Sequence, residues 1–364
     1  MSTSKITNSI NKLKELLTEF GIVKNDIKTA ISNKLSVQAG EIVDVGQNMS
    51  YWAKKINSLG VSQYSDIDGM RYGNSTIREF PEGWKFAPRT KDHAELMFAG
   101  CSYITTIPQL DTSKGRSFGN MFNDCSSLTT IPQLDTSSGT SFYNMFFNCK
   151  SLTTIPQLDT SSGTSFYNMF FNCSSLTTIP QLDTSSGTSF YSMFFNCSSL
   201  TTIPQLDISK GRSFDNMFSG CSSLTTIPQL DISSGTGFYN MFSGCSSLTT
   251  IPQLDTSKGR NFDNMFCDCT NLTTIPQLDT SSGTSFYNMF RGCKSLTTLG
   301  GFVGLSESLS LSSSTKLTHD SLMNVINNLA TVTSSTTLTL GSTNLAKLTD
   351  EEKKVATDKG WTLA

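Results

Sequence analysis

A single pattern of apolar and polar positions repeats every 24 residues between Met97 and Cys293. Nearly every copy runs Phe-x-x-Met-Phe-x-x-Cys and continues as Ser-Leu-Thr-Thr-Ile-Pro-Gln-Leu-Asp. One cysteine marks each copy, without any insertion: Cys101, Cys125, Cys149, Cys173, Cys197, Cys221, Cys245, Cys269 and Cys293. A repeat of this length with regularly placed leucines is typical of a solenoid, and each copy is called a coil below and named by its cysteine.

Two kinds of backbone are predicted within each coil. The first apolar residues lie at i, i+3, i+4 and i+7, which predicts two helical turns with one buried face; in the Cys149 coil they are Phe142, Met145, Phe146 and Cys149. The next three recur at every third position, which predicts an extended segment that turns its side chains inward: Leu152, Ile155 and Leu158. Pro156 lacks a backbone donor, so the stacked strands should be very short.

A polar turn closes each coil. Asp159 begins the sequence Asp-Thr-Ser-Ser-Gly, in which its side chain can accept backbone N–H bonds and Gly163 can supply a positive φ. The row of aspartates at this position raises calcium binding as an alternative. Turn capping is favoured, because no second acidic row exists to complete a cage of oxygen ligands.

The first 60 residues carry a different pattern. Apolar residues at intervals of 4, 3, 4 and 3 form a heptad seam: Ile6, Ile10, Leu13, Leu17 and Phe20. A helix this short is marginal alone in water, so it needs either copies of itself or the short helices expected over 25–31 and 47–59. We expect residues 1–60 to form a helical module for anchoring or oligomerisation, and residues 61–95 to form a linker that becomes an N-terminal cap.

The template ends after Leu299. Two strand–helix units are expected beyond it: a strand at 309–311 with a helix at 317–329, then a strand at 338–340 with a helix at 350–358. Atypical, more polar units at the end of a solenoid are what a cap should contain. The sequence therefore predicts an α/β repeat fold: a leucine-rich-repeat solenoid of about nine 24-residue coils over 96–300, with a small N-terminal helical domain and an α/β C-terminal cap over 301–364.

Composition argues against several classes of function. The net charge of −2 and the pI near 5.8 give no basic footprint for nucleic acid. No apolar run approaches the roughly 18 to 20 residues of a membrane span, and the start of the chain shows no secretory signal. A catalytic site needs a unique constellation, whereas each template residue recurs from coil to coil. Since no phosphate loop, Gly-x-Ser-x-Gly elbow or metal-ligand cluster occurs either, we expect no enzyme, no cofactor and no metal site.

The marker cysteines should form a ladder with about 4.8 Å between coils. Neighbours at that distance could be bridged by disulfides, but a buried column of thiols is favoured because Cys is among the most buried residue types. Cys267 lies two residues before Cys269 and lacks partners for a metal site, since the chain has only His93 and His319.

Departures from the template mark a candidate binding surface. Three consecutive coils carry an extra tyrosine and phenylalanine four residues apart: Tyr143 with Phe147, Tyr167 with Phe171, and Tyr191 with Phe195. On a helix each pair would share one face, and the six rings would form a patch about 10 Å long that can stack on a glycan or contact a protein. Folding does not require an aromatic residue at the Phe147 position, where other coils have Asn123, Ser219, Ser243, Cys267 and Arg291. The alternative is that these rings fold under the edge of the solenoid, or that the coils were copied with a neutral residue.

Three coils replace polar turn residues with cations: Lys114 and Arg116, Lys210 and Arg212, and Lys258 and Arg260. In two of them the tyrosine becomes Asp215 or Asp263, three residues after the arginine, where an ion pair can form. Exposed pairs contribute only about 0 to 1 kcal/mol, so we interpret these residues as solubilising surface.

The Met-Phe-x-x-Cys-x-x-Leu repeat resembles the BspA-like leucine-rich repeats of bacterial surface proteins. The ends are similar to modules of phage-encoded proteins, and the matching stretches are Asn25–Lys34, Tyr51–Ile56, Leu317–Leu329, Leu338–Leu348 and Lys359–Leu363. The usual turn Asp-Thr-Ser-Asn-Val-Thr-Asn-Met is altered here to Asp-Thr-Ser-Ser-Gly-Thr-Ser-Phe, so the exposed faces can differ from those of the family.

This resemblance implies a phage virion structural protein, a fibre or appendage whose solenoid adheres to the host surface or to its glycans. Residues 1–60 would bind other virion proteins, and analogy with phage fibres implies a homo-oligomer, with a trimer favoured. The protein would be made in the host cytoplasm and reside in the virion. Two alternatives remain open: a ligand-free decoration or joining protein of the virion, and a BspA-like bacterial surface adhesin.

Overall fold

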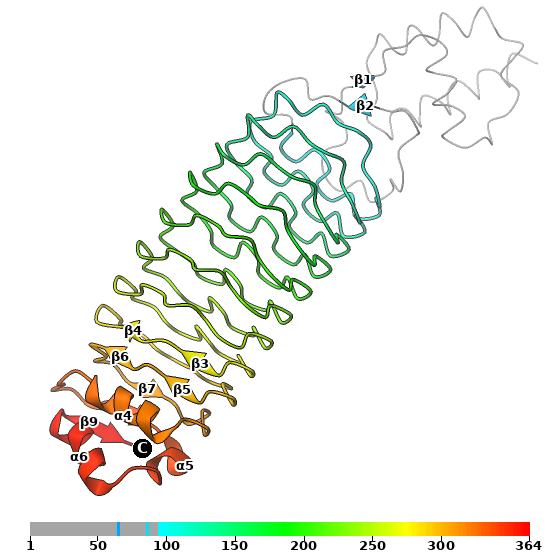
Figure 1. Cartoon of the computed structure of the whole chain (residues 1–364). Coiled ribbons are helices and arrows are strands. Elements are labelled where there is room, and N and C mark those ends of the chain that lie inside the picture. The colour runs from blue at the N-terminus through cyan, green and yellow to red at the C-terminus, as the bar shows by residue number, and fades with distance from the viewer. Residues whose placement is uncertain (1–63, 66–84, 87–93) are drawn as a thin grey trace, which may run out of the picture.

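The computed structural model describes residues 64–65, 85–86 and 94–364. The coils stack one on another into an elongated array, and the helices lie at its C-terminal end (Figure 1). The helices and strands are β1 (Tyr64–Ser65), β2 (Lys85–Phe86), β3 (Thr274–Ile275), β4 (Leu278–Asp279), β5 (Thr298–Leu299), β6 (Phe302–Val303), β7 (Leu309–Ser310), α4 (His319–Asn327), β8 (Thr336–Thr339), α5 (Gly341–Leu345), α6 (Asp350–Asp358) and β9 (Trp361–Leu363). The strands pair in parallel as β1-β2, β3-β5, β4-β6 and β7-β8-β9. The strands in the stack are two residues long, as expected beside the repeated proline.

Apolar side chains of successive coils form continuous columns inside the stack. In the Cys149 coil, Phe142, Met145, Phe146 and Cys149 are fully buried, while Leu152, Ile155 and Leu158 are at most 8% exposed. The ring of Phe146 stacks on those of Phe122 and Phe170, with 5.6 and 5.5 Å between centroids. The predicted inward-facing residues are therefore confirmed, and the fold is a leucine-rich-repeat solenoid.

The prediction of two helical turns in each coil is wrong. Residues 143–148 form turns, in which Asn144 and Asn148 have positive φ values of 52° and 58°. Their N–H groups donate to the next coil, to the carbonyl oxygens of Tyr167 at 2.9 Å and Phe171 at 2.7 Å. An α-helix would use these donors internally, and a left-handed residue at every fourth position prevents that. The segment thus links coils laterally while still burying residues at helix-like spacing.

The turn after the extended segment is capped as predicted, but its glycine has another role. Asp159 Oδ1 accepts hydrogen bonds from the N–H of Ser161 at 3.1 Å and from its hydroxyl at 2.7 Å. Gly163 does not have a positive φ. A Cβ at Gly163 would lie 2.7 Å from Phe166 Cζ and 2.9 Å from the carbonyl oxygen of Thr160. The glycine is therefore needed for close packing against the phenylalanine column.

The residues after the solenoid form a sheet flanked by short helices. Thr318 caps α4 by accepting the N–H of Ser321 at 3.2 Å, and Thr349 and Glu352 form a reciprocal capping box at the start of α6. The indole N–H of Trp361 donates to the carbonyl oxygen of Ala330 at 2.8 Å and fixes β9. The helix α5 was not expected from the sequence.

One contact between α4 and α6 predicts a pH dependence of stability. His319 Nε2 lies 2.9 Å from Glu352 Oε1, and its Nδ1 lies 3.5 Å from Asp320. These hydrogen bonds raise the pKa of His319 above its usual 6.5, chiefly through Glu352, whereas the Thr349 N–H lowers the pKa of Glu352 below 4.5. A raised histidine pKa stabilises the fold below pH 6.5 and loses that effect as the pH rises through the raised value, while the carboxylate contributes only above its own range.

We therefore expect His319→Gln to lower the thermal unfolding midpoint of the C-terminal unit at about pH 5.5 and to change it little at about pH 8.5. Differential scanning calorimetry of both proteins at the two pH values measures this effect. A midpoint difference that is the same at both values would show that the imidazolium charge contributes nothing.

Candidate functional site

The six predicted contact residues, Tyr143, Phe147, Tyr167, Phe171, Tyr191 and Phe195, form two separate columns, and we call them together the aromatic block. Phe171 stacks between Phe147 and Phe195, with centroids 4.6 and 4.5 Å apart, and all three are half-buried. Tyr167 and Tyr191 are exposed and stack at 5.4 Å. The Tyr143 hydroxyl donates to Glu95 Oε1. The pairs do not share a helix face, because the segment is not helical.

Stacking decides which parts of these rings a ligand can reach. The Phe147, Phe171 and Phe195 planes lie within 10° and 12° of parallel, so each ring covers a face of its neighbour. Both faces of Phe171 are therefore covered by rings, whereas Phe147 and Phe195 each stack on one neighbour in this column. Ring edges remain for contact, which suits an apolar protein surface better than a sugar ring.

The predicted ion pairs are absent from the described residues. Neither Arg212 nor Arg260 pairs with the aspartate three residues later. Asp215 instead accepts the N–H of Tyr239 at 2.8 Å, and Asp263 accepts the N–H of Tyr287 at 2.7 Å. Each carboxylate thus accepts a backbone N–H of the next coil.

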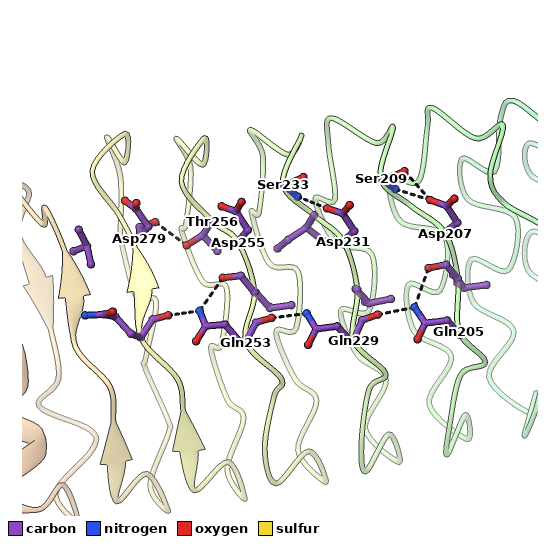
Figure 2. A pocket seen from close by; sticks show the side chains of 16 residues that line it. Gln205, Asp207, Ser209, Gln229, Asp231, Ser233, Gln253, Asp255, Thr256 and Asp279 are labelled. Atoms are coloured by element: carbon purple, nitrogen blue, oxygen red, sulfur yellow. Dashed lines mark hydrogen bonds between the residues drawn. The ribbon is translucent and has the colours of Figure 1, made fainter.

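A groove that the sequence did not predict runs along a different segment of the coils from the aromatic block. It encloses about 920 Å³ and is lined chiefly by the Gln-Leu-Asp stretches of the Cys197, Cys221, Cys245 and Cys269 coils. Figure 2 shows the aspartates in one row and the glutamines in a second, parallel row. We call it the acceptor groove, for the reasons given next.

The glutamines of the acceptor groove are held in one orientation. The side-chain amide Nε2 of Gln205 donates to the backbone carbonyl of Gln229 at 2.6 Å, and Gln229 and Gln253 repeat this bond to the following coil at 2.6 and 2.7 Å. Because Nε2 of each amide faces a carbonyl oxygen, Oε1 of the same amide points away from that hydrogen bond. The sequence signal was the glutamine kept between proline and leucine in every coil except the Cys293 coil.

The aspartates of the acceptor groove use one oxygen each within their own turn. Oδ1 of Asp207, Asp231, Asp255 and Asp279 accepts the N–H of the serine two residues later, at 3.0 to 3.1 Å. Hydrogen bonds from Ser209 and Ser257 lower the pKa of Asp207 and Asp255, so both are anionic at neutral pH. No described residue donates to any of the four Oδ2 atoms.

The cysteine ladder is buried and reduced. All ten cysteines are free thiols, and that of Cys149 donates to the carbonyl oxygen of Phe122 at 3.1 Å, a bond repeated from coil to coil. Burial raises the pKa of Cys101 to about 11 and that of Cys221 to about 12. The buried-thiol interpretation is confirmed, because all ten cysteines are buried and unbridged. Thiols with such raised pKa values are poor nucleophiles at neutral pH.

Three further sequence predictions concern metal binding, membrane insertion and oligomerisation. Within the described residues, no group of three or more His, Cys, Asp or Glu side chains is placed to hold a metal ion. No helix in that part of the chain has the length and apolar character to cross a bilayer. The proposed oligomerisation residues Ile6, Ile10, Leu13, Leu17 and Phe20 lie outside the described residues.

Coils of one period with stacked leucine, phenylalanine and cysteine columns define a leucine-rich-repeat solenoid. The chain belongs to the family described as "Mycoplasma protein of unknown function, DUF285", whose model matches overlapping stretches from residue 66 to residue 301. The BspA-like leucine-rich-repeat part of the resemblance agrees with this assignment. No curated protein matches the chain.

Several solved leucine-rich-repeat structures align with the chain at low identity and low TM-score. A leucine-rich repeat protein from Bacteroides ovatus is 16% identical and aligns over 80% of this chain and 85% of its own, with a TM-score of 0.29. A leucine rich cell surface protein from Faecalibacterium prausnitzii is 19% identical over 69% and 83% of the two chains, with a TM-score of 0.28. A T. pallidum leucine rich repeat protein is 18% identical over 71% and 84%, with a TM-score of 0.26.

Proposed function

We propose that this protein is an adhesin of a phage virion, a fibre or appendage that binds a protein of the host surface through the aromatic block. The observation that carries the proposal is the half-exposed column of Phe147, Phe171 and Phe195. The coil does not need these rings, because Ser219 and Ser243 occupy the same position in the coils that follow. Exposed stacked aromatics of this kind mark interaction surfaces.

The binding role is tested by replacing the three phenylalanines with serine, the residue of neighbouring coils. We expect the triple variant Phe147→Ser, Phe171→Ser and Phe195→Ser to remain folded and to bind host cells at least about tenfold more weakly, because aromatic hot-spot residues contribute about 2 kcal/mol or more. Binding of the labelled full chain to cells, with and without protease treatment of the cells, measures this effect.

A matched variant extends the column instead of removing it. Ser219→Phe places a ring next to Phe195, and we expect binding to strengthen. Unchanged binding by both the triple variant and Ser219→Phe would remove the aromatic block from consideration and leave a ligand-free structural protein.

The virion role is supported by the end stretches that resemble phage modules, and in this proposal residues 1–60 join the protein to other virion proteins as a homo-oligomer, with a trimer favoured. Mass spectrometry of purified particles tests it. Absence of the chain from particles, together with its presence on bacterial cells, would favour the bacterial surface adhesin.

A further inference from the structure

The acceptor groove presents hydrogen-bond acceptors to a ligand and few donors. The Nε2 atoms of Gln205, Gln229 and Gln253 are used within the groove wall, which leaves the Oε1 atoms. The aspartates use Oδ1 for their own turns, which leaves Oδ2. A complementary ligand must therefore bring donors along its whole length.

Two further acceptors lie in the residues that line the groove. In most coils a buried threonine hydroxyl donates to the aspartate carbonyl of the next coil, as Thr256 does to Asp279 at 2.7 Å. Ile208 and Ile232 replace that threonine here. No described residue then donates a hydrogen bond to the carbonyl oxygens of Asp231 and Asp255. The substitution by isoleucine thus leaves these two carbonyl oxygens without the donor that the other coils supply.

The two rows of acceptors differ in charge. The glutamine row is neutral and suits hydroxyl donors, whereas the aspartate row is anionic and suits ammonium donors. Lys210 and Lys258 stand near Asp207 and Asp255 and lower their pKa slightly, but Ser234 occupies the corresponding position beside Asp231. Ser282 occupies it beside Asp279 as well, so negative charge is less compensated at Asp231 and Asp279 than at Asp207 and Asp255.

The spacing of the rows favours an extended polymer. The groove spans the three intervals between the Gln205 and Gln277 coils, about 14 Å at about 4.8 Å per interval. Each interval repeats the same pair of acceptors, so a chain that lies along the stack meets equivalent groups at regular steps. A peptide would bury its carbonyl groups against acceptors at a desolvation penalty, whereas sugar hydroxyls can all donate.

From these observations we propose that the acceptor groove binds an extended glycan with free amino groups, which places hydroxyls against the glutamine row and ammonium groups against the aspartate row. This site is distinct from the aromatic block, which lies on another segment of the coils. It would give the solenoid a second ligand of a different chemical class.

Calorimetric titration of the full chain with three probes tests the proposal: a fully deacetylated chitosan oligosaccharide, its N-acetylated counterpart of equal length, and spermine. The deacetylated oligosaccharide has hydroxyl and ammonium groups, its counterpart has hydroxyls and neutral acetamido groups in place of the ammonium groups, and spermine has ammonium groups without hydroxyls. We expect the first to bind at least about tenfold more tightly than either of the others, since a charged hydrogen bond contributes about 1.5 kcal/mol or more and 1.4 kcal/mol is tenfold.

Matched variants locate the binding. Asp231→Asn with Asp255→Asn keeps the oxygen that caps each turn and removes the charge, so we expect the oligosaccharide to bind about tenfold more weakly. The same change at Asp135 and Asp159, outside the groove, should leave the affinity unchanged, as should the serine variants of the aromatic block. Three results would each overturn the proposal: no binding of the deacetylated oligosaccharide, equal binding by spermine, or equal weakening by the Asp135 and Asp159 pair.

Discussion

Phe170→Ala is expected to lower the free energy of unfolding by about 3–5 kcal/mol, the largest effect of any single truncation proposed for this protein. The Phe170 ring is fully buried and stacks between Phe146 and Phe194, with 5.5 Å to each centroid. Alanine would leave a cavity that cannot collapse, because hydrogen bonds hold the coil on both sides. Chemical denaturation followed by circular dichroism measures the loss, in a transition that includes the Cys173 coil.

The adjacent residue in the chain supplies the control. Phe171 also stacks on rings of both neighbouring coils, but it is half-buried and belongs to the aromatic block. We expect Phe171→Ala to lower the free energy of unfolding by only about 1 kcal/mol, as for a partly exposed side chain. An equal loss for both variants would mean that the Phe171 column is part of the core and that its stacking serves folding alone.

The columns of the core could be predicted from the sequence because they depend only on burial and period. Residues such as Phe146, Leu152 and Leu158 are apolar in every coil, and only one stack places them all inside. The backbone between them could not be predicted from apolar spacing alone, since helical turns and left-handed turns bury the same positions. The deciding signal was the Asn, Asp or Gly found at the Asn148 position of every coil, the residue types that best tolerate a positive φ.

The candidate sites show the same division. The aromatic block was found because Phe147, Phe171 and Phe195 depart from the template, yet the stacking that covers their faces depends on a backbone geometry that periodicity does not contain. The acceptor groove could not be predicted in the same way, because its glutamines and aspartates are template residues and do not stand out from the repeat. Only the hydrogen bond from Gln229 Nε2 to the next coil reveals which atoms remain for a ligand.

Gly163→Ala is expected to lower the free energy of unfolding by about 1–3 kcal/mol, although alanine normally stabilises an ordinary backbone conformation. The added methyl would lie 2.7 Å from Phe166 Cζ and 2.9 Å from Phe142 Cε2. Both rings are clamped in the phenylalanine column, where they stack at 5.8 Å on each other. The methyl must therefore displace the column or the turn, and the unfolding free energy of the variant measures that strain.

Gly244→Asn provides the opposite case within the same template. Gly244 has a φ of +73°, and a Cβ there would meet only Gly220, at 3.6 Å. Asparagine occupies this position as Asn172, whose Nδ2 donates to Asn148 Oδ1 at 2.8 Å. We expect Gly244→Asn to change the unfolding free energy by less than about 0.5 kcal/mol. If Gly163→Ala were equally neutral, the column of Phe142 and Phe166 could yield to a methyl group, and close packing against that column would not account for the glycine.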